Sequence, residues 1–558
     1  MQLVVRDQYG IDVDIRFDRP DPQYGDYATN VALQLAGKLG RNPREVAQEI
    51  ADQLNQTGVF SEVSVAGPGF INLRVSAHYL AQELASNWSD RYGESQDGAG
   101  KTVIVEFPSP NMAKPFSVGH LRPSNQGWAV KRLMEVTGWR VITDNHLGDY
   151  GAPFGVWVVG FLHYSNDDAL ESDGVYELGR VYIEAKKALK EEKERGESTL
   201  ADQVQDWLLR LERGDDEAVR YSERFKAISL DHIHHVMTRL RIHTDHELGE
   251  AFYVQRGKEA VGRLVESGVA VRNDDGSVIV PLDEYGFDVP LLVQKSNGAA
   301  LYATTDLATL LYRDEVWHPD RTVYAVGSEQ QFYFTQVFAL AKKLGIHTEL
   351  IHVWFGTIDQ KNEDGTREKM SSRKGVVLME ELLDTAEAKA REVVAGRDVG
   401  DEDVRKVALG AIKFSDFVAD RRTNILFDWA TIFALTGYSG PYVQYAAVRV
   451  NKILRDNAGY QRVDVSQYGY DEEKEVLKLL LEYPEVVSFA ARELEPHKVA
   501  QYLHDLARTM NRYYEHTPIA TDAVSEVERS ARLELLERVA WVFDSGLGIL
   551  GIEVPERM

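Results

Sequence analysis

The residues best suited to chemistry lie in two short clusters far apart in the chain. Lys114 precedes Ser117-Val118-Gly119-His120, in which glycine permits close approach to the backbone and histidine can donate a hydrogen bond to an anionic oxygen. Lys369-Met370-Ser371-Ser372-Arg373-Lys374-Gly375 places three cations within six residues. Lysines beside small hydroxyls suit a clamp that closes on a triphosphate. By itself, the first cluster is also compatible with an ordinary strand–helix unit, and the second with a basic surface loop.

A third group of residues suits a cationic ligand. Tyr302 and Asp306 are four residues apart and share a face if their segment is helical. A ring and a carboxylate together suit a guanidinium, although helix capping would explain the same residues. Asn145 and Asp149 follow an apolar segment, where ligand binding and turn formation are equally good explanations. Three histidines lie close together in the sequence, His232, His234 and His235. We expect them at a surface or interface rather than in a metal site, because adjacent positions do not share a helix face.

These residues need a framework that brings them together. An apolar strand over 103–107, a loop, a helix to Gly138 and a strand over 139–143 predict a parallel crossover, which is the seed of a doubly wound sheet. Pro123 predicts that the helix begins near Leu121, since proline fits only the first turn. A further strand over 321–326 ends at Gly327-Ser328-Glu329-Gln330-Gln331. Such sheets bind ligands at the carboxyl ends of their strands.

The two ends of the chain predict separate domains. Residues 1–95 show helical spacing at 30–39 and 43–54, and then a strand–turn–strand pattern over 63–75 that presents Phe70 and Asn72. From about residue 400 the pattern is helical, and Tyr445 and Arg449 lie near one face of a helix over 442–455. Both places could serve as RNA-binding faces or as plain structural surface. We predict an N-terminal α+β domain (1–95), a Rossmann-like α/β domain (96–395) and an all-α helical bundle (396–558).

Composition narrows the class of protein. The 558 residues exceed a single core, and the absence of cysteine excludes disulfides, thiolate zinc sites and a cysteine nucleophile. No apolar run approaches the roughly 20 residues of a membrane span, and the N-terminus lacks a signal-peptide layout. We therefore expect a cytoplasmic protein without a membrane partner. The net charge of −25 argues against nonspecific polyanion binding but allows one locally basic face.

Taken together, these segments resemble the class I aminoacyl-tRNA synthetases, and specifically their arginyl-tRNA synthetase family. Residues 117–120 look like the "HIGH" motif and residues 369–375 look like the "KMSKS" loop, in the family's order. The resemblance covers nearly the whole chain. The arginyl assignment rests on Ser109-Pro110-Asn111, Ala113-Lys114-Pro115-Phe116, Leu147-Gly148-Asp149, Phe154-Gly155, Leu301 to Asp306, Gly327 to Gln331, Gly67 to Asn72, Tyr442 with Gln444-Tyr445, and Pro555-Glu556-Arg557-Met558.

The resemblance implies a two-step reaction. L-Arginine would attack the α-phosphorus of ATP, releasing pyrophosphate, and the arginyl group would then pass to the terminal adenosine of tRNA(Arg). The first step is expected to need bound tRNA. Mg²⁺ would arrive with ATP, and no separate metal site is implied. We expect the protein to be a monomer. The implied catalytic residues are Lys114, His120, Lys369 and Lys374, and the implied ATP-binding residues are Ser117, Gly119, His120, Met370, Ser371 and Ser372. The implied arginine-binding residues are Ser109, Asn111, Asn145, Glu250, Tyr302, Asp306 and Gln330, and the implied tRNA-binding residues are Phe70, Asn72, Tyr442, Tyr445, Arg449 and Met558.

Three positions depart from the family pattern, and one of them is Pro123, early in the helix. Ser117 stands where the first motif has histidine, and Ser372 stands where the loop motif has its second lysine. Lys374 or Lys114 would then supply the charge. The two serines motivate an alternative hypothesis, a catalytically impaired synthetase-like protein that binds tRNA or other RNA.

Overall fold

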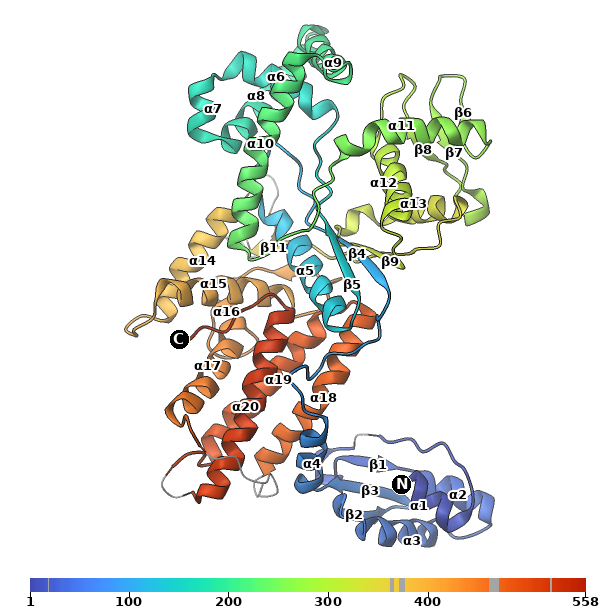
Figure 1. Ribbon diagram of the computed structural model, residues 1–558, viewed down its shortest axis with the longest axis vertical. Coiled ribbons are helices and arrows are strands. Elements are labelled where there is room, and N and C mark those ends of the chain that lie inside the picture. The colour runs from blue at the N-terminus through green and yellow to red at the C-terminus, as the bar shows by residue number, and fades with distance from the viewer. Residues whose placement is uncertain (19, 362–365, 371–376, 461–470, 522–523) are drawn as a thin grey trace. The chain divides into compact units, whose positions relative to one another are not determined.

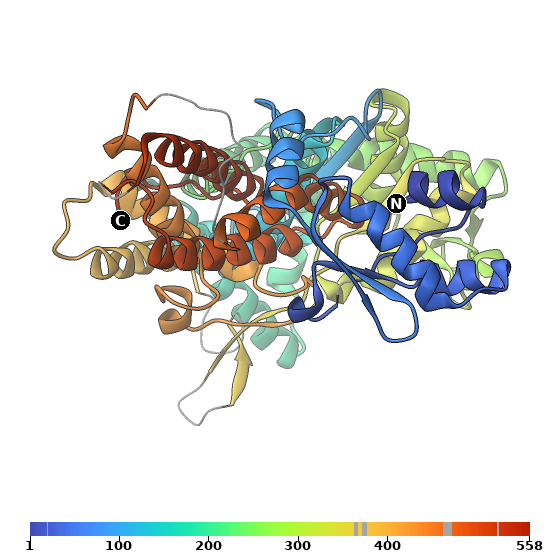
Figure 2. The ribbon, with the colours of Figure 1, turned by 90° about the horizontal axis from the view of Figure 1, so that it is seen from below.

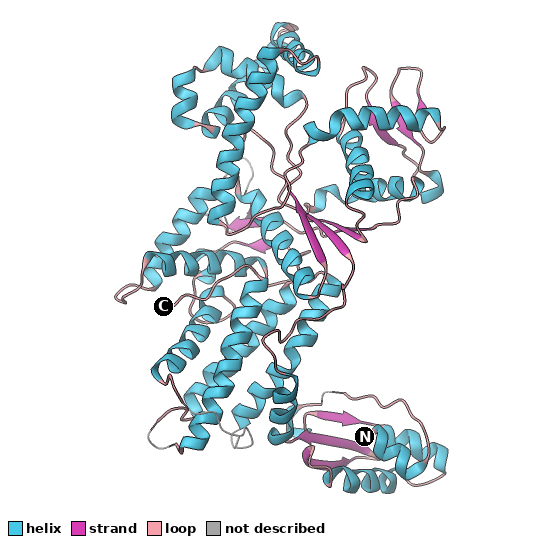
Figure 3. Cartoon of the chain, in the orientation of Figure 1, coloured by secondary structure: helices cyan, strands magenta, loops and turns pink. Residues whose placement is uncertain are grey.

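The computed structural model describes residues 1–558 except 19, 362–365, 371–376, 461–470 and 522–523, and most of it is helical (Figure 1, Figure 3). Two compact units are present, and each combines segments that are distant in the sequence. The first contains Met1–Gly93, Tyr445–Val486 and Tyr502–Ser545, and the second contains Glu94–Gln444, Val487–Gln501 and Gly546–Met558. Among the described residues, no helix has the length and apolarity needed to cross a membrane.

The first unit begins with a small α+β lobe. Its antiparallel sheet has the order β1-β3-β2, from β1 (Tyr27–Thr29), β2 (Phe60–Ala66) and β3 (Phe70–Val75). The helices are α1 (Gln2–Tyr9), the 3₁₀ turn η1 (Pro22–Tyr24), α2 (Val31–Leu39), α3 (Pro43–Asn55) and α4 (Ala77–Asn87). Val46, Ile50 and Leu54 recur at helical spacing on α3 and are buried in the lobe's core. The two predicted helices and the strand–turn–strand segment are thereby confirmed.

Parts of four long helices complete the first unit: α17 (Gly440–Asp456), α18 (Asp471–Glu493), α19 (His497–His516) and α20 (Glu526–Ile549). These helices lie side by side (Figure 1, Figure 2). Tyr502 donates to the Leu479 carbonyl at 2.7 Å, and Tyr483 donates to Ser545 Oγ at 2.7 Å, so buried hydroxyls join α18 to both α19 and α20. The expected helical carboxyl-terminal region is confirmed, while the exact domain limits stay a prediction.

The second unit is built on a parallel sheet of order β10-β9-β4-β5. Its strands are β4 (Thr102–Glu106), β5 (Arg140–Asp144), β9 (Arg321–Tyr324) and β10 (Glu349–His352). Val103, Ile104 and Val105 are fully buried, as expected for a strand covered on both faces. Strands β5 and β9 pair with β4 on opposite sides, so the strand order reverses at β4. A doubly wound sheet binds its ligands at the carboxyl ends of the strands where the order reverses.

The connection between β4 and β5 confirms the predicted strand–helix–strand unit. After a loop, a 3₁₀ turn η2 (Val118–His120) leads into α5 (Leu121–Val136). The helix begins at Leu121, as Pro123 predicted. Gly127 has no room for a side chain, since a Cβ there would lie 2.4 Å from Phe107.

The remaining elements of the second unit come from the segments that connect and follow these strands. Among the described residues, five helices follow β5: α6 (Ala152–Tyr164), α7 (Asp167–Asp173), α8 (Val175–Glu194), α9 (Thr199–Glu212) and α10 (Asp216–Arg239). Next come α11 (Glu250–Glu266) and an antiparallel sheet of β6 (Val271–Arg272), β7 (Val278–Val280) and β8 (Leu291–Gln294). Short 3₁₀ turns, η3 (Asp283–Tyr285) and η4 (Ser328–Gln330), and helices α12 (Tyr302–Val316) and α13 (Gln331–Lys343) flank β8 and β9. A third sheet of β11 (Ile358–Lys361), β12 (Arg367–Lys369) and β13 (Ile425–Leu426) lies with α14 (Met379–Val393), α15 (Asp401–Asp416) and α16 (Trp429–Ile432).

Candidate active site

A cavity of about 720 Å³ lies at the carboxyl ends of β4 and β9. Its walls come from the loop after β4, the start of α5, the starts of α11, α12 and α13, and the β11–β12 hairpin. Eleven of the residues expected at the site line it: Ser109, Asn111, Ser117, Gly119, His120, Glu250, Tyr302, Asp306, Gln330, Lys369 and Met370. The parallel sheet therefore brings together segments that are far apart in the sequence.

The start of α5 presents a neutral histidine to the cavity. The Ser117 backbone N–H donates to His120 Nδ1 at 3.2 Å, so Nδ1 acts as an acceptor and the ring hydrogen is on Nε2. Burial, reinforced by the charge of Lys114, lowers the pKa of His120 to about 4. Gly119 is exposed at the same wall, where a Cβ would meet only Ser117 Oγ, at 3.3 Å. This end of the cavity can donate a hydrogen bond to an anion while leaving space beside the backbone.

Helix α10 holds the loop between β4 and α5. Ser229 Oγ accepts from the Ala113 N–H at 2.8 Å, and His232 Nε2 accepts from the Phe116 N–H at 3.0 Å. His232 is 9% exposed and packs against this loop, so of the expected surface or interface positions it occupies an interface between segments, whereas His234 and His235 are more than half exposed. Sequence spacing missed Ser229 and His232 because their partners are backbone groups in a distant segment of the chain.

The second cationic cluster is only partly described. Lys369 ends β12, is exposed and lines the cavity, and Met370 is buried beside it, with its N–H donating to the Ile358 carbonyl at 2.9 Å. Ser371, Ser372 and Lys374 lie outside the described residues. Lys114 does not line the cavity, and its ammonium lies 5.3 Å from the centroid of the Tyr182 ring. Burial and the charge of Lys186 lower the pKa of Lys114.

Another part of the cavity wall is acidic. Tyr302 and Asp306 lie on the first turns of α12, and Glu250 begins α11. Burial, followed by the charges of Asp306 and Asp149, raises the pKa of Glu250 to about 8. Burial also raises the pKa of Asp306, whereas His146 and a hydrogen bond from Tyr333 act in the opposite direction. Desolvated carboxylates that repel one another are well placed to bind a cation.

Two residues expected to contact arginine have additional structural roles. Asn111 lies against Gly148, where a Cβ would come within 2.4 Å of Asn111 Oδ1. Asn145 is fully buried and does not line the cavity, and its Oδ1 accepts from the Ser109 N–H at 3.2 Å. Ser109 adopts a φ of 53°, in a region that few residues other than glycine occupy. The loop at the cavity wall is thus held in a costly conformation by buried polar contacts.

A buried ion network beneath the cavity escaped sequence analysis. Arg313 of α12 donates to Glu106 at 2.7 Å and to Asp144 at 2.8 Å, at the ends of β4 and β5. All three side chains are buried, and Glu106 lines the cavity. The three residues come from distant parts of the sequence. The one available signal was the position of Arg313 on the buried face of its helix, where an arginine needs an acidic partner. It fixes α12, which carries Tyr302 and Asp306, to the sheet.

The RNA-binding candidates of the first unit lie in two places. Phe70 is 40% exposed at the start of β3, whereas Asn72 is 8% exposed, so Phe70 is the more accessible of the two. Arg449 lies between two rings, 5.0 Å from the Tyr445 centroid and 4.6 Å from the Tyr514 centroid. Tyr514 is 46% exposed and was not among the residues expected to bind RNA.

Two further candidates belong to the second unit. Tyr442 is partly buried in the first turn of α17, and its N–H donates to Ser439 Oγ at 3.2 Å. Met558 is 7% exposed, and the preceding N–H groups of Glu556 and Arg557 donate to the Asp403 carboxylate at 2.9 and 3.0 Å. The end of the chain is therefore fastened to α15.

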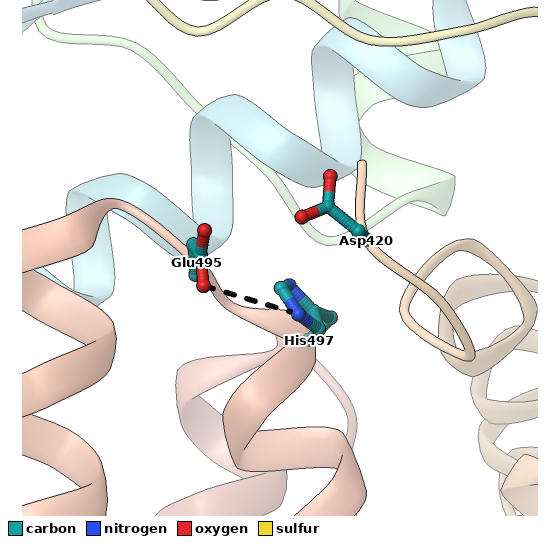
Figure 4. Close-up of side chains that lie close together, drawn as sticks. All are labelled: Asp420, Glu495 and His497. Atoms are coloured by element: carbon teal, nitrogen blue, oxygen red, sulfur yellow. Dashed lines mark ion pairs between the residues drawn. The ribbon is translucent and has the colours of Figure 1, made fainter. Parts of the chain in front are cut away.

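One group among the described residues has the donor atoms of a metal site: Asp420, Glu495 and His497 (Figure 4). Arg422 binds both of its carboxylates, reaching Glu495 at 2.8 Å. Because the guanidinium already supplies the positive charge, these residues form an ion-paired cluster. None of them lines the cavity.

Comparisons with known proteins agree with this architecture. Residues 83–429 match the family described as tRNA synthetases class I (R), catalytic domain, residues 443–558 match the DALR anticodon binding domain, and residues 3–75 match the arginyl tRNA synthetase N terminal domain. The arginine–tRNA ligase of Lactobacillus delbrueckii subsp. bulgaricus is 33% identical, covering 100% of this chain and 98% of the relative. The arginine–tRNA ligase of Cellvibrio japonicus is 35% identical, covering 96% of this chain and 94% of the relative.

A solved structure shows the same fold. The arginyl-tRNA synthetase of Thermus thermophilus has a TM-score of 0.78 against this chain, with 25% identity, and the match covers 100% of this chain and 98% of that one. The full-length likeness to two ligases, at 33% and 35% identity, and a catalytic-domain match over more than half of the chain agree on one family. The chain therefore belongs to the arginyl-tRNA synthetases, the arginine–tRNA ligases of class I.

Proposed function

We propose that the chain activates L-arginine with ATP and transfers it to the terminal adenosine of tRNA(Arg). The arginine carboxylate would attack the α-phosphorus, forming arginyl-adenylate and releasing pyrophosphate. A hydroxyl of the terminal ribose would then attack the arginyl carbonyl, forming the ester and releasing AMP. The observation that supports this proposal most is that one cavity is lined by His120 and Lys369 as well as by the carboxylates of Glu250 and Asp306.

The arginine end of the site selects its ligand by charge. Glu250 and Asp306 would face the guanidinium, Tyr302 would pack beside it, and Gln330 would supply a polar contact. Tyr333 donates to Asp306 and thus favours the ionised form that a cation needs. A ligand without a positive charge would leave the carboxylates buried and unpaired, which is costly. Lysine carries the charge but lacks the planar donor fork of arginine.

The ATP end works by positioning and electrostatics. Gly119 would allow the nucleotide to approach the start of α5, and His120 Nε2–H would donate to a phosphate oxygen. Lys369, together with Lys374, would stabilise the charge that develops on the transferring phosphorus and on pyrophosphate. Lys114 does not line the cavity, but its charge acts on His120 and would add to the positive field there. We assign Ser117, Met370, Ser371 and Ser372 to ATP binding, and Ser109 and Asn111 to the arginine side, where Asn145 would act indirectly by holding the Ser109 N–H.

Mg²⁺ would enter the site with ATP. The described residues that line the cavity hold no group of three metal ligands, and Glu106 is already paired with Arg313. Mg²⁺ commonly keeps phosphate and water as most of its ligands. It would partly neutralise the phosphate charge, so that the carboxylate of arginine can approach.

tRNA(Arg) would contact both ends of the chain. Phe70, with Asn72 behind it, would serve the N-terminal contact, and Tyr442, Tyr445, Arg449 and Met558 would serve the anticodon side. The exposed ring of Tyr514, which lies beside Arg449, suits contact with unpaired bases. We expect the enzyme to act as a cytoplasmic monomer.

Arginine-dependent exchange of pyrophosphate into ATP tests the activity. We expect exchange with arginine in the presence of tRNA, little exchange without tRNA, and none with lysine or citrulline. Retained tRNA binding without arginine-dependent exchange would instead support the impaired RNA-binding alternative. The full-length likeness to arginine–tRNA ligases favours the active enzyme.

A further inference from the structure

Arg122, the second residue of α5, is buried at the back of the cavity. Its side chain is 2% exposed, and it lies two residues after His120. Nε donates to Asp416 Oδ1 at 2.8 Å, while Nη1 donates to the Gly356 carbonyl at 2.8 Å and to the Thr423 carbonyl at 3.0 Å. The guanidinium carbon lies 5.7 Å from the centroid of the Phe355 ring. One side chain thus binds three segments of the second unit.

These segments support the β11–β12 hairpin. Gly356 leads into β11, and Thr423 leads into β13, which pairs with β11 in parallel. Strand β12 pairs with β11 and ends at Lys369. Arg122 therefore joins the start of α5, which carries His120, to the hairpin that carries Lys369.

The hairpin base is closely packed where Arg122 binds it. A Cβ at Gly356 would lie 2.4 Å from Asn424 Oδ1 and 2.9 Å from the Asn424 backbone nitrogen. The Gly356 N–H donates to the Arg421 carbonyl, and the Thr357 N–H donates to Asn424 Oδ1, both at 3.0 Å. Movement of Arg122 relative to this base would be passed to β11 rather than absorbed locally.

The chemistry of the contact requires arginine. A guanidinium donates from several nitrogens in one plane, so it can bind a carboxylate and two carbonyls at once, whereas a lysine ammonium is a compact charge on a flexible stem. The side chain of Asp416, like that of Arg122, is 2% exposed, so the ion pair is buried. Buried ion pairs contribute little net stability, but their geometry is directional. A role in setting relative position explains the pair better than a role in stability.

We propose that Arg122 is a positioning residue for the ATP-dependent step. It holds the start of α5 and the β11–β12 hairpin at the separation at which His120 and Lys369 reach the same phosphate chain. This inference rests on the proposed function. It concerns ATP alone, because the three groups that Arg122 binds belong to Asp416, Gly356 and Thr423 and not to the proposed arginine-binding residues.

Pyrophosphate exchange by Arg122→Lys tests the proposal. Lysine keeps a positive charge, but its single nitrogen cannot occupy the positions of both Nε, which binds Asp416, and Nη1, which binds the two carbonyls. With arginine and tRNA saturating, we expect kcat/KM for ATP to fall about 10- to 100-fold, as small misplacements of reacting groups do. We expect the KM for arginine to stay within about twofold. Arg132→Lys is the matched control on α5, since Arg132 is partly exposed and pairs with nearby Glu135.

The outcomes separate positioning from general damage. Rates are expressed per active site, counted from the arginyl-adenylate or arginyl-tRNA formed in a single turnover. An unchanged kcat/KM for ATP, or an equal rise in the KM values for ATP and arginine, would overturn the proposal. Asp416→Asn removes the negative charge but keeps the shape of the side chain. We expect it to lower kcat/KM for ATP as selectively as Arg122→Lys does. It provides the test if Arg122→Lys does not fold. Absence of exchange by the wild-type chain would refute the proposed function instead.

Discussion

Arginine binding should become tighter as pH rises toward 8, because Glu250 must lose a proton to pair with the guanidinium. In the free site, burial and the neighbouring carboxylates of Asp306 and Asp149 raise the pKa of Glu250 to about 8. Bound arginine would bring a positive charge and favour the carboxylate. The pKa of Glu250 should therefore fall on binding, and protons should be released.

The size of the effect follows from this pKa. A carboxyl group with a pKa of about 8 is ionised to about 3% at pH 6.5, about 24% at pH 7.5 and about 76% at pH 8.5. If only the ionised form binds arginine tightly, the Kd should fall about eightfold from pH 6.5 to 7.5 and about threefold more by pH 8.5. At pH 7.5, binding should release about 0.8 proton. The guanidinium stays charged throughout this range, so it adds no pH dependence.

Isothermal titration calorimetry of arginine into the full chain measures both quantities. The Kd is determined at the three pH values, and proton release is obtained by repeating the titration at pH 7.5 in buffers with different ionisation enthalpies. Glu250→Gln should bind arginine more weakly and lose the pH dependence. Glu259→Gln, an exposed position on the same helix, should retain it. A wild-type Kd that is constant from pH 6.5 to 8.5, or a slope that survives in Glu250→Gln, would refute the reasoning.

Three further substitutions test other parts of the structure. Tyr333→Phe removes the hydroxyl that donates to Asp306, so the KM for arginine should rise about tenfold in pyrophosphate exchange, with the KM for ATP unchanged. Arg313→Gln leaves Glu106 and its neighbouring carboxylate buried without a cation, and the free energy of unfolding measured in urea should fall by about 3–5 kcal/mol. Phe70→Ala removes an exposed ring, and filter binding should show at least about fivefold weaker affinity for tRNA(Arg).

Each substitution has a matched control. Tyr285→Phe changes a tyrosine packed on the same hydrophobic cluster as Tyr333 and should leave both KM values unchanged. Arg405→Gln breaks an exposed pair with Glu402, where the cost should stay below about 1 kcal/mol. Phe17→Ala removes another exposed ring of the N-terminal lobe and should bind tRNA normally. Equal effects in a variant and its control would contradict the corresponding prediction.

The sequence determined the elements whose signals are local. The periodicity of Val46, Ile50 and Leu54, the turn at Gly67–Gly69, and Pro123 at the first turn of α5 each act within a few residues, and each was confirmed. The glycine–histidine helix start and the Tyr302–Asp306 spacing were also visible, because a motif is a local arrangement. Their resemblance to a known family then pointed to the family that the comparisons show.

Only the tertiary structure decided which distant residues serve this site. The sequence predicted only a surface or interface position for His232, and folding brings its imidazole to the Phe116 N–H. Tyr333, Arg313 and Arg122 carried no signal of their own, since their partners lie in other segments of the chain. The sequence contains the donors and acceptors, but hydrogen bonds and desolvation act over a few ångströms in space. A parallel sheet that gathers separate segments at one strand edge determines which of them meet.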